Sequence, residues 1–322
     1  MISKSKWNTK KLKRKSEGFA TSLLRYVFLI SVGYIVLYPI FSAISTAIKQ
    51  DVAFYDVSLY WLPKYVTGEN FKIAFESMDY AKAILRTMSL DVVSAVIEII
   101  MCAIIAYGFA RFEFKGKKIF EFLLMATIII PIQVYLVSMV INFKSFDVVG
   151  ILGLFHQITG IDLRPNLLNT NWAMYLPSLF GMGLRSGILI YIYIQFFRGF
   201  PKELEEAAYI DGAGPFRTFW SIAVPSSSVA ILTVAVFAMV WHWNDCLLGL
   251  MYFTKDYPLA VQLSNLPSTL TVNNPFVGGA ADVMKNSVVM AGCLLYIAPI
   301  LIGYLCVQHR FIKSIDRVGI TG

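Results

Sequence analysis

Six long apolar stretches restrict the possible folds of this chain more than any other feature of its sequence. Each reaches or exceeds the roughly 20 residues that an α-helix needs to cross the hydrocarbon core of a bilayer. They are Ser22–Ile48, Ala83–Phe109, Ile119–Ile141, Trp172–Phe197, Ser226–Phe253 and Ser287–Val307. Backbone polar groups inside lipid must bond to one another, so we expect six transmembrane helices. The predicted fold class is therefore an all-α, polytopic membrane protein.

The composition agrees with a membrane protein. Hydrophobic residues make up 57% of the 322 residues, charged residues 15%, and the mean hydropathy is +0.64, which is too apolar for a soluble domain. Much of the net charge of +8 lies in a tail ahead of the first apolar stretch, where basic residues set topology and contact anionic lipid. These residues are Lys4, Lys6, Lys10, Lys11, Lys13, Arg14 and Lys15. We therefore expect no nucleic-acid partner.

The distribution of lysine and arginine predicts the orientation of the spans. Most of the 28 basic residues lie in the N-terminal tail, after the second span, after the fourth span and in the C-terminal tail. The positive-inside rule places these segments, and both termini, on the cytoplasmic side of the cell membrane. The predicted parts are a basic tail (1–21), a six-helix membrane domain (22–309) and a cytoplasmic C-terminal tail (310–322). Within the membrane domain we expect a cytoplasmic loop at 198–225 and an outer loop at 254–286.

The sequence lacks the common motifs of catalysis, metal binding and nucleotide binding. It contains no G-x-x-x-x-G-K-[ST], no H-E-x-x-H and no G-x-S-x-G, so it does not bind ATP through a P-loop. Its four cysteines form no C-x-x-C pair and its three histidines have no zinc spacing. We expect no metal, no cofactor and no disulfide in this chain. Four prolines, Pro39, Pro131, Pro177 and Pro299, are expected to kink or end their helices.

A short acidic segment, PKELEEAAYIDGAG, interrupts the apolar pattern between the fourth and fifth stretches. We expect a helix with Pro201 at its first position, glutamates at the positive end of its dipole and a stop at Gly212. A second short helix would begin at Pro215 and end at Pro225. The residues alone leave two interpretations open. The segment is either an amphipathic helix at the membrane interface or a low-relief surface on which another protein docks.

The spacing in this segment resembles the EAA signature of permeases of ATP-binding-cassette (ABC) importers. The match consists of Glu206-Ala207-Ala208, three residues, Gly212, nine residues, Ile222, one residue, then Val224-Pro225. Val224 stands where the family pattern has leucine. The stretches AYGFARFEFKGKK, QFFRGFPKELEEAAYIDGAG and VWHWNDCLLGLMYF are also similar to the sugar-importing, maltose-permease-like branch. The resemblance covers nearly the whole chain and implies a type I ABC importer permease fold with both termini inside.

In that family the acidic helix is the coupling helix, which sits in a groove of the ATPase subunit. The resemblance assigns coupling to Glu203, Glu206, Ala207, Ala208, Asp211 and Gly212, with Glu206 expected to pair with a basic residue of the ATPase. It implies four partners: a second, homologous permease, an ATPase dimer that binds ATP and magnesium, an extracytoplasmic solute-binding protein and membrane lipid.

Three other segments take their interpretation from the resemblance. The stretch 263–279, LSNLPSTLTVNNPFVGG, has the composition of an exposed connection. In the family the matching loop probes the sugar site of the docked binding protein, which would make Leu270, Thr271, Asn273 and Asn274 contact residues. The stretch 155–165 looks like an insertion that adjusts the fit to a binding protein. The tail 310–322 is similar to the family's basic tail, which reaches between the ATPase subunits.

Polar residues inside the predicted spans are candidates for function, because they are costly in lipid. Arg185 lies about 20 Å along a helix from Arg198. It either forms an ion pair with Asp91 or Glu98, the interpretation that we favour because a lone buried charge is costly, or it faces the transport path and binds substrate hydroxyls or an acidic sugar group. The run Trp241-His242-Trp243-Asn244-Asp245 is either an aromatic belt at the interface or a sugar-binding wall. The candidates for the substrate path are Arg185, Trp241, Trp243, Asn244 and Asp245.

The sequence predicts a permease subunit of an ATP-driven importer of a sugar or oligosaccharide. The nearest alternative is a glycerol-phosphate or polyol importer, in which Arg185 would bind phosphate. Two alternatives come from other classes. One is an ATP-independent membrane enzyme built around Asp91, Glu98, Arg185 and His242, and the other is a purely structural assembly factor.

Overall fold

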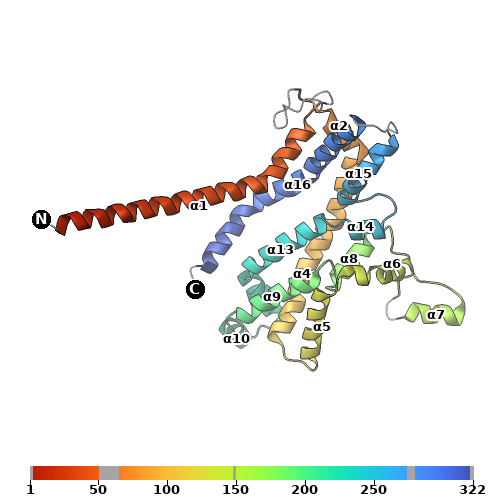
Figure 1. Ribbon diagram of the computed structural model, residues 1–322. Helices are drawn as coiled ribbons and strands as arrows, with labels where there is room; N and C mark the ends of the chain where they lie inside the picture. Colours follow the sequence, from red (N-terminus) through yellow and green to blue (C-terminus); the bar gives the residue numbers. More distant parts are fainter. Residues whose placement is uncertain (1–2, 51–64, 148–149, 274–279, 320–322) are drawn as a thin grey trace. The chain divides into compact units, whose positions relative to one another are not determined.

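The structure, a computed structural model, describes residues 3–50, 65–147, 150–273 and 280–319 (Figure 1). Helices form all of the regular secondary structure in these ranges, and one isolated antiparallel bridge joins Lys49 and Val66. The all-α prediction is therefore confirmed for this part of the chain. The chain divides into two compact units, one of residues 1–74 and 270–294 and one of residues 75–269 and 295–322.

The first unit contains the long helix α1 (Ser3–Ala47) and the start of α2 (Glu69–Ser77). A buried asparagine ties the two helices together. The side-chain amide of Asn70 donates hydrogen bonds to the backbone carbonyls of Ala47 (2.8 Å) and Lys49 (2.9 Å). Because the last carbonyls of a helix have no partner within it, this side chain caps the end of α1.

Three helices in the described part of the chain are long and apolar enough to cross a membrane. They are Thr21–Ala47, Tyr80–Arg111 and Lys285–Cys306. A fourth results if Pro215–Ser226 and Ser228–Trp243, which meet at 80°, form one span. The first, second and sixth predicted stretches are thus continuous helices, and the last of them belongs to α16 (Ala280–Gly319).

The other three predicted stretches are interrupted, which corrects the expectation of continuous helices. In the third, α5 (Lys117–Ile129) is followed by a 3-10 turn (Ile132–Val134) and α6 (Leu136–Lys144). In the fourth, α8 (Trp172–Leu179) and α9 (Ser186–Gly199) are separate helices. In the fifth, α13 (Ser228–Trp243) is followed by α14 (Leu247–Tyr252).

Each interruption has a local cause. Pro131 lacks a backbone N–H and disfavours helical backbone at Ile130, whose φ and ψ are −72° and 117°. Between α8 and α9, Gly181 and Arg185 have positive φ values of 67° and 58°, which a right-handed helix excludes. At the end of α13, the Asn244 amide donates to the Val240 carbonyl (2.7 Å) and satisfies one of the last carbonyls of that helix.

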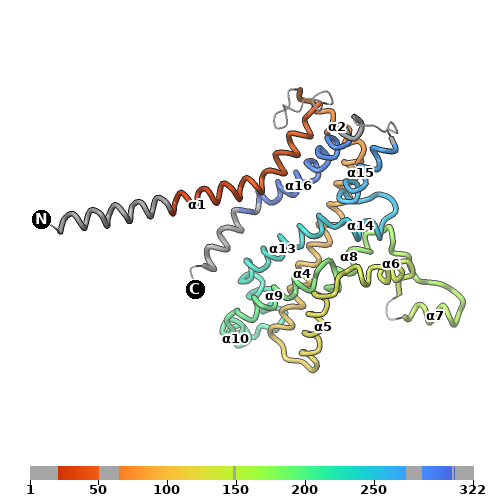
Figure 2. The backbone as a smooth tube through the Cα atoms, in the orientation of Figure 1, coloured from red at the N-terminus to blue at the C-terminus, as the bar shows by residue number. Residues whose placement is uncertain are grey.

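The second unit is built around one long helical segment. This segment comprises α3 (Tyr80–Thr87), a π-helical turn (Met88–Val92) and α4 (Val93–Arg111). α4 packs against α8, α9 and α13, and Figure 2 shows their backbones side by side. Its contact face carries small residues, Ala95, Cys102, Ala103 and Ala106, which are buried with Tyr193, Phe197 and Val234 of the neighbouring helices. Small residues let helix backbones approach closely where lipid supplies no hydrophobic driving force.

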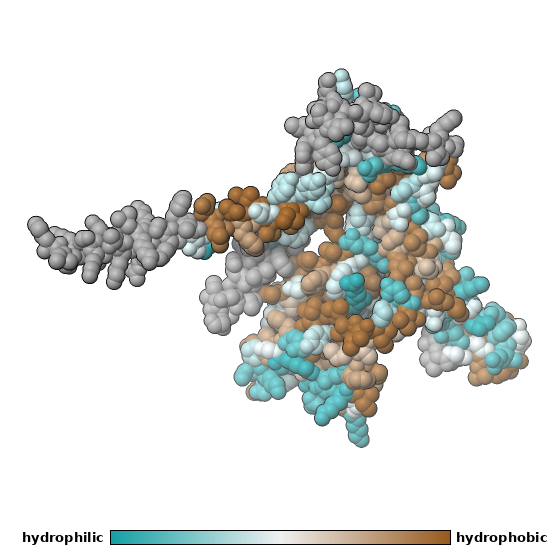
Figure 3. Space-filling view, viewed as in Figure 1, coloured by the Kyte–Doolittle hydropathy of each residue, from teal (hydrophilic) through white to brown (hydrophobic). Residues whose placement is uncertain are grey.

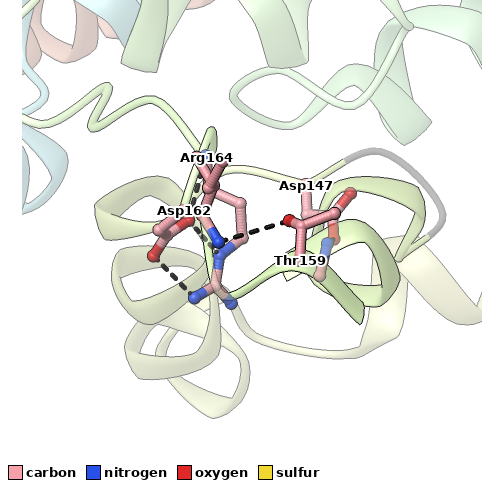
Figure 4. A network of polar contacts seen from close by, with 6 residues as sticks. Asp147, Thr159, Asp162 and Arg164 are labelled. Carbon is pink, nitrogen blue, oxygen red and sulfur yellow. Dashed lines mark hydrogen bonds and ion pairs between the residues drawn. The ribbon is translucent and has the colours of Figure 1, made fainter. Parts of the chain in front are cut away.

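The predicted insertion at 155–165 folds with α7 (Ile151–Thr159) as a small hairpin (Figure 4). The Asp147 carboxylate accepts hydrogen bonds from two backbone N–H groups of the first turn of α7 (3.0 and 2.6 Å). The Arg164 guanidinium contacts both carboxylate oxygens of Asp162 at 2.8 Å and lowers the pKa of that carboxyl group. The carboxylates of Asp147 and Asp162 therefore find their partners within the hairpin.

Several boundary predictions differ from the structure in detail. Pro39 and Pro299 lie inside α1 and α16 without ending them, whereas α8 ends two residues after Pro177. The stretch predicted as an outer loop from residue 263 is helical through Asn273, as part of α15 (Leu259–Asn273).

Candidate functional site

The three helix interruptions meet around one cavity of about 650 Å³ in the second unit. The α5–α6 break contributes Ile130, Pro131, Ile132 and Gln133, the α8–α9 break Leu184 and Arg185, and the α13–α14 break Asn244, Asp245 and Cys246. Non-helical backbone is tolerated at membrane depth where it lines a cavity rather than lipid. The interruptions therefore mark a site. Three of the five predicted path residues, Arg185, Asn244 and Asp245, line it.

Arg185 reaches the cavity from a strained backbone position directly before α9. Its φ of 58° is in the left-handed region, which non-glycine residues rarely adopt. Its guanidinium carbon lies 5.0 Å from the centroid of the Trp241 ring, a cation–π contact. Within the described part of the chain, Arg185 makes no ion pair with Asp91 or Glu98. The ion-pair interpretation is therefore wrong, and Arg185 faces the cavity instead.

Glu98 has a different partner, which the sequence analysis missed. It lies on α4 with no exposed surface, and its Oε2 is 2.7 Å from Nε2 of His242 on α13. Its other oxygen accepts a hydrogen bond from the Ser186 hydroxyl at the start of α9. Three helices therefore meet at one buried carboxylate. A Cβ atom at Gly183 would lie 2.8 Å from Ser178 Oγ and 2.9 Å from Glu98 Oε1, so a larger residue there would displace these side chains.

The two tryptophans of the 241–245 run do not line the cavity. Trp243 is buried and packs 5.9 Å from the ring of Tyr296. The ring centroids of Trp241 and Phe237 are 5.3 Å apart in a stacked arrangement. The Trp241 ring also makes the cation–π contact with the Arg185 guanidinium. The residues of this run therefore have two different roles. Its aromatic residues pack within the bundle, while Asn244 and Asp245 line the cavity.

The predicted acidic helix is α10 (Glu203–Ile210). It begins two residues after Pro201, with Lys202 at the cap position, and Gly212 follows with φ 79°. A second helical segment runs from α11 (Pro215–Thr218) through a π-helical turn (Phe219–Ala223) to α12 (Val224–Ser226).

The predicted coupling residues lie on two sides of α10 and its C-terminal turn. Glu203, Glu206, Ala207, Asp211 and Gly212 are exposed. Ala208, in contrast, is 8% exposed and packs inward, so the two alanines do not form one flat docking surface.

Glu205 is the residue of α10 whose role the sequence analysis missed. Its Oε1 accepts a hydrogen bond from Nε of Arg111, at the end of α4, over 2.9 Å. The two side chains are 7% and 5% exposed. Arg111 also donates to the carbonyl of Phe200 (2.8 Å). The spacing could have indicated that Glu205 faces inward with Ala208, since the two residues are three positions apart and lie on the same face of a helix.

Large apolar side chains are exposed beside these charges. The exposed fractions are 48% for Leu204, 86% for Ile210, 73% for Phe216 and 42% for Trp220. Figure 3 shows that hydrophilic residues also gather at this end of the second unit, around α10. An apolar patch rimmed by polar residues is typical of a protein-protein contact.

The predicted contact residues for a binding protein fall at the end of α15. Leu270 is buried and Thr271 is exposed. Asn273 is the last residue of the helix, and Asn274 lies outside the described residues.

Comparisons with known proteins identify the family of this chain. A family model described as "Binding-protein-dependent transport system inner membrane component" matches residues 99–317. The trehalose transport system permease protein SugB of Mycobacterium tuberculosis (strain CDC 1551 / Oshkosh) is 26% identical over 291 residues, which are 90% of this chain and 94% of the relative. The arabinooligosaccharides transport system permease protein AraQ of Halalkalibacterium halodurans is 24% identical over 319 residues, 97% and 100% of the two chains.

A solved structure shares the fold. It is a bacterial ABC transporter involved in the import of the acidic polysaccharide alginate, with a TM-score of 0.66 and 18% identity, and the match covers 92% of this chain and 98% of that one. Because the family model matches well over half of the sequence, the chain belongs to the inner membrane components of binding-protein-dependent transport systems.

Proposed function

We propose that the chain is one permease subunit of an ATP-driven ABC importer that moves a sugar or oligosaccharide into the cytoplasm. The observation that carries this proposal is the cavity formed where three helices are interrupted, with polar groups on its wall. Ligand sites of membrane transporters are commonly built from such broken helices. The relatives named for trehalose and arabinooligosaccharides favour a saccharide as the substrate. Membership of a transport family favours this function over an ATP-independent enzyme or an assembly factor.

The proposed topology has six spans and places both termini in the cytoplasm. It counts each pair of helices separated by an interruption as one span. The bias of basic residues toward one side supports the orientation. The proposed partners are a second, homologous permease, an ATPase dimer that binds ATP and magnesium, and an extracytoplasmic binding protein. The exposed end of α15, with Thr271, is the proposed contact for the binding protein.

The proposed coupling element is α10 with the turn at Gly212. Its exposed apolar patch would enter a groove of the ATPase, and Glu206 would meet a basic residue there. The buried Arg111–Glu205 pair joins α10 to the end of α4, which carries Glu98 further along its length. A movement of the ATPase would thus reach the helices around the cavity as a shift of a rigid element.

Reconstitution of the complete importer tests this function. Proteoliposomes that contain both permeases and the ATPase, supplied with binding protein and ATP, should accumulate a radiolabelled saccharide from a panel of mono- and oligosaccharides. Glycerol 3-phosphate belongs in the panel because the glycerol-phosphate importer is the nearest alternative. Uptake that needs no ATPase, or uptake of no saccharide in the panel, would refute the proposal.

A substitution at the turn after α10 should uncouple the importer. In Gly212→Asp, a side chain would occupy a backbone position with φ 79°, which is strained for residues other than glycine, and would add charge to the docking surface. No atom of this chain lies within 4 Å of the position of that Cβ, so a clash within the subunit is not the cause. We expect uptake to fall at least about tenfold, measured with substrate-stimulated ATPase activity in the same vesicles.

Gly214→Asp is the matched control for this substitution. Gly214 is two residues away, has a negative φ of −76°, caps α11 and also has no atom of this chain within 4 Å of its Cβ position. Aspartate is favourable at a helix N-cap, so this variant should transport normally. Equal uptake by the two variants and the wild type would contradict the coupling role.

A further inference from the structure

One arginine on the wall of the cavity, Arg185, forms no ion pair within the part of the chain that the structure describes. The Arg185 side chain is exposed where it lines the cavity. Its recorded partner is the ring of Trp241, and a cation–π contact leaves the net charge in place. A cation in a membrane-spanning segment is costly without an anion. No ion pair within the described residues offsets this cost for Arg185.

The nearby carboxylates are engaged elsewhere. Glu98 is bonded to His242 and Ser186 and has no exposed surface. Asp245 lies on the cavity wall, but its oxygens accept hydrogen bonds from the backbone N–H of Leu248 at 3.1 and 3.4 Å, at the start of α14. Helix N-termini stabilise a carboxylate in this position. Within the described ranges, neither carboxylate is within ion-pair distance of Arg185.

The remaining polar groups around the cavity are neutral. Gln133, Thr127 and Asn244 lie on its wall together with backbone of the interrupted segments. Amides and hydroxyls of this kind suit the hydroxyl groups of a saccharide. The volume of about 650 Å³ is within the usual range of small-molecule sites.

The backbone at Arg185 supports a functional role for its side chain. The φ of 58° is strained for arginine, and such strain is concentrated at ligand-binding sites, where the surrounding structure maintains it. Gly181 and Gly183 in the same short segment offer positions where left-handed backbone would cost less. The segment nevertheless places the arginine at the position that points into the cavity.

We propose that Arg185 binds the anionic group, a carboxylate or a phosphate, of a saccharide during its passage, so that the importer prefers acidic over neutral saccharides. A guanidinium matches both anions with two parallel hydrogen bonds, while Gln133 and Asn244 bind hydroxyl groups. This inference rests on the proposed function and names the substrate class of the same site.

The test measures uptake of three probes by the complete importer with its binding protein in proteoliposomes. The probes are digalacturonate, its neutral counterpart digalactose, and glucose 6-phosphate, which distinguishes the two sources of negative charge. The wild type should take up at least one of the anionic probes in preference to digalactose. In Arg185→Gln, the ratio of anionic to neutral uptake should fall at least about tenfold. Arg185→Lys, which keeps the charge but loses the planar fork, should give an intermediate ratio.

Lys82→Gln is the control, because Lys82 is an exposed cation of α3 that is paired with Asp79 and does not line the cavity. Its ratio should equal that of the wild type. Wild-type preference for digalactose would overturn the inference and leave the proposed saccharide import intact. A Gln variant that assembles poorly but keeps the wild-type ratio would also overturn it, since Arg185 would then serve the contact between subunits.

Discussion

Reversal of the charge at Arg111 is expected to separate ATP hydrolysis from uptake. In Arg111→Glu, two carboxylates would face each other where the wild type has an ion pair with 5% and 7% exposed side chains. Loss of one partner of a buried ion pair costs about 3–5 kcal/mol, which is enough to release α10 from the end of α4. Uptake per ATP hydrolysed should fall at least about tenfold in proteoliposomes, while ATP hydrolysis continues.

Two further variants test whether the effect is specific to the buried Arg111–Glu205 pair. The double reversal Arg111→Glu/Glu205→Arg restores opposite charges and should recover part of the coupling, although the hydrogen bond from Arg111 to the Phe200 carbonyl is lost. Arg198→Glu breaks a more exposed pair with Glu121, whose side chains are 45% and 30% exposed. Exposed pairs contribute little, so its coupling should remain near that of the wild type. A normal coupling ratio in Arg111→Glu would disprove the role of the buried pair.

The second large effect is expected at Glu98. Glu98→Ala removes the common partner of His242 and Ser186, which are 2% and 3% exposed, and leaves their polar atoms unbonded inside the helix bundle. Burial of such a polar group without a hydrogen-bond partner costs about 1–3 kcal/mol. The purified importer in detergent should therefore unfold at a lower temperature, and the defect should be visible without any substrate.

Conservative and exposed substitutions separate charge from packing at this position. Glu98→Gln keeps the shape and one acceptor, so its loss of stability should be smaller than that of Glu98→Ala. Glu113 is 89% exposed, and its hydrogen bond with Lys117 lowers the pKa of its carboxyl group. Glu113→Gln should nevertheless unfold at the same temperature as the wild type. Equal unfolding temperatures for Glu98→Ala and Glu113→Gln would show that the buried cluster adds no stability.

Much of the architecture was predictable from periodicity and composition. The long apolar stretches led to the helical class, because a chain in lipid has few other ways to satisfy its backbone. The spacing around Glu206 and Gly212 located α10 to within two residues of its observed start. These features depend on neighbours close in sequence, which act the same way in any fold.

The interruptions of the helices were less predictable. Pro131 was recognised as a helix breaker, but the gap at 180–185 and the stop at Asn244 lie inside stretches that are apolar on average. A scan for apolar stretches averages over about 20 residues and passes across such short breaks. The end of α15 shows the converse case, since a segment rich in Asn, Ser and Thr is helical in the structure.

The sequence by itself determined a helical membrane protein with an acidic helix between two apolar segments, because helix signals and hydropathy are local properties. Tertiary structure alone decided the partners of the charges. Glu98 pairs with His242, 144 positions away, Arg111 pairs with Glu205, 94 positions away, and Arg185 is left facing a cavity. Which side chains meet depends on how α4, α9 and α13 pack. The separation of two residues along the chain does not give the distance between the helices that contain them.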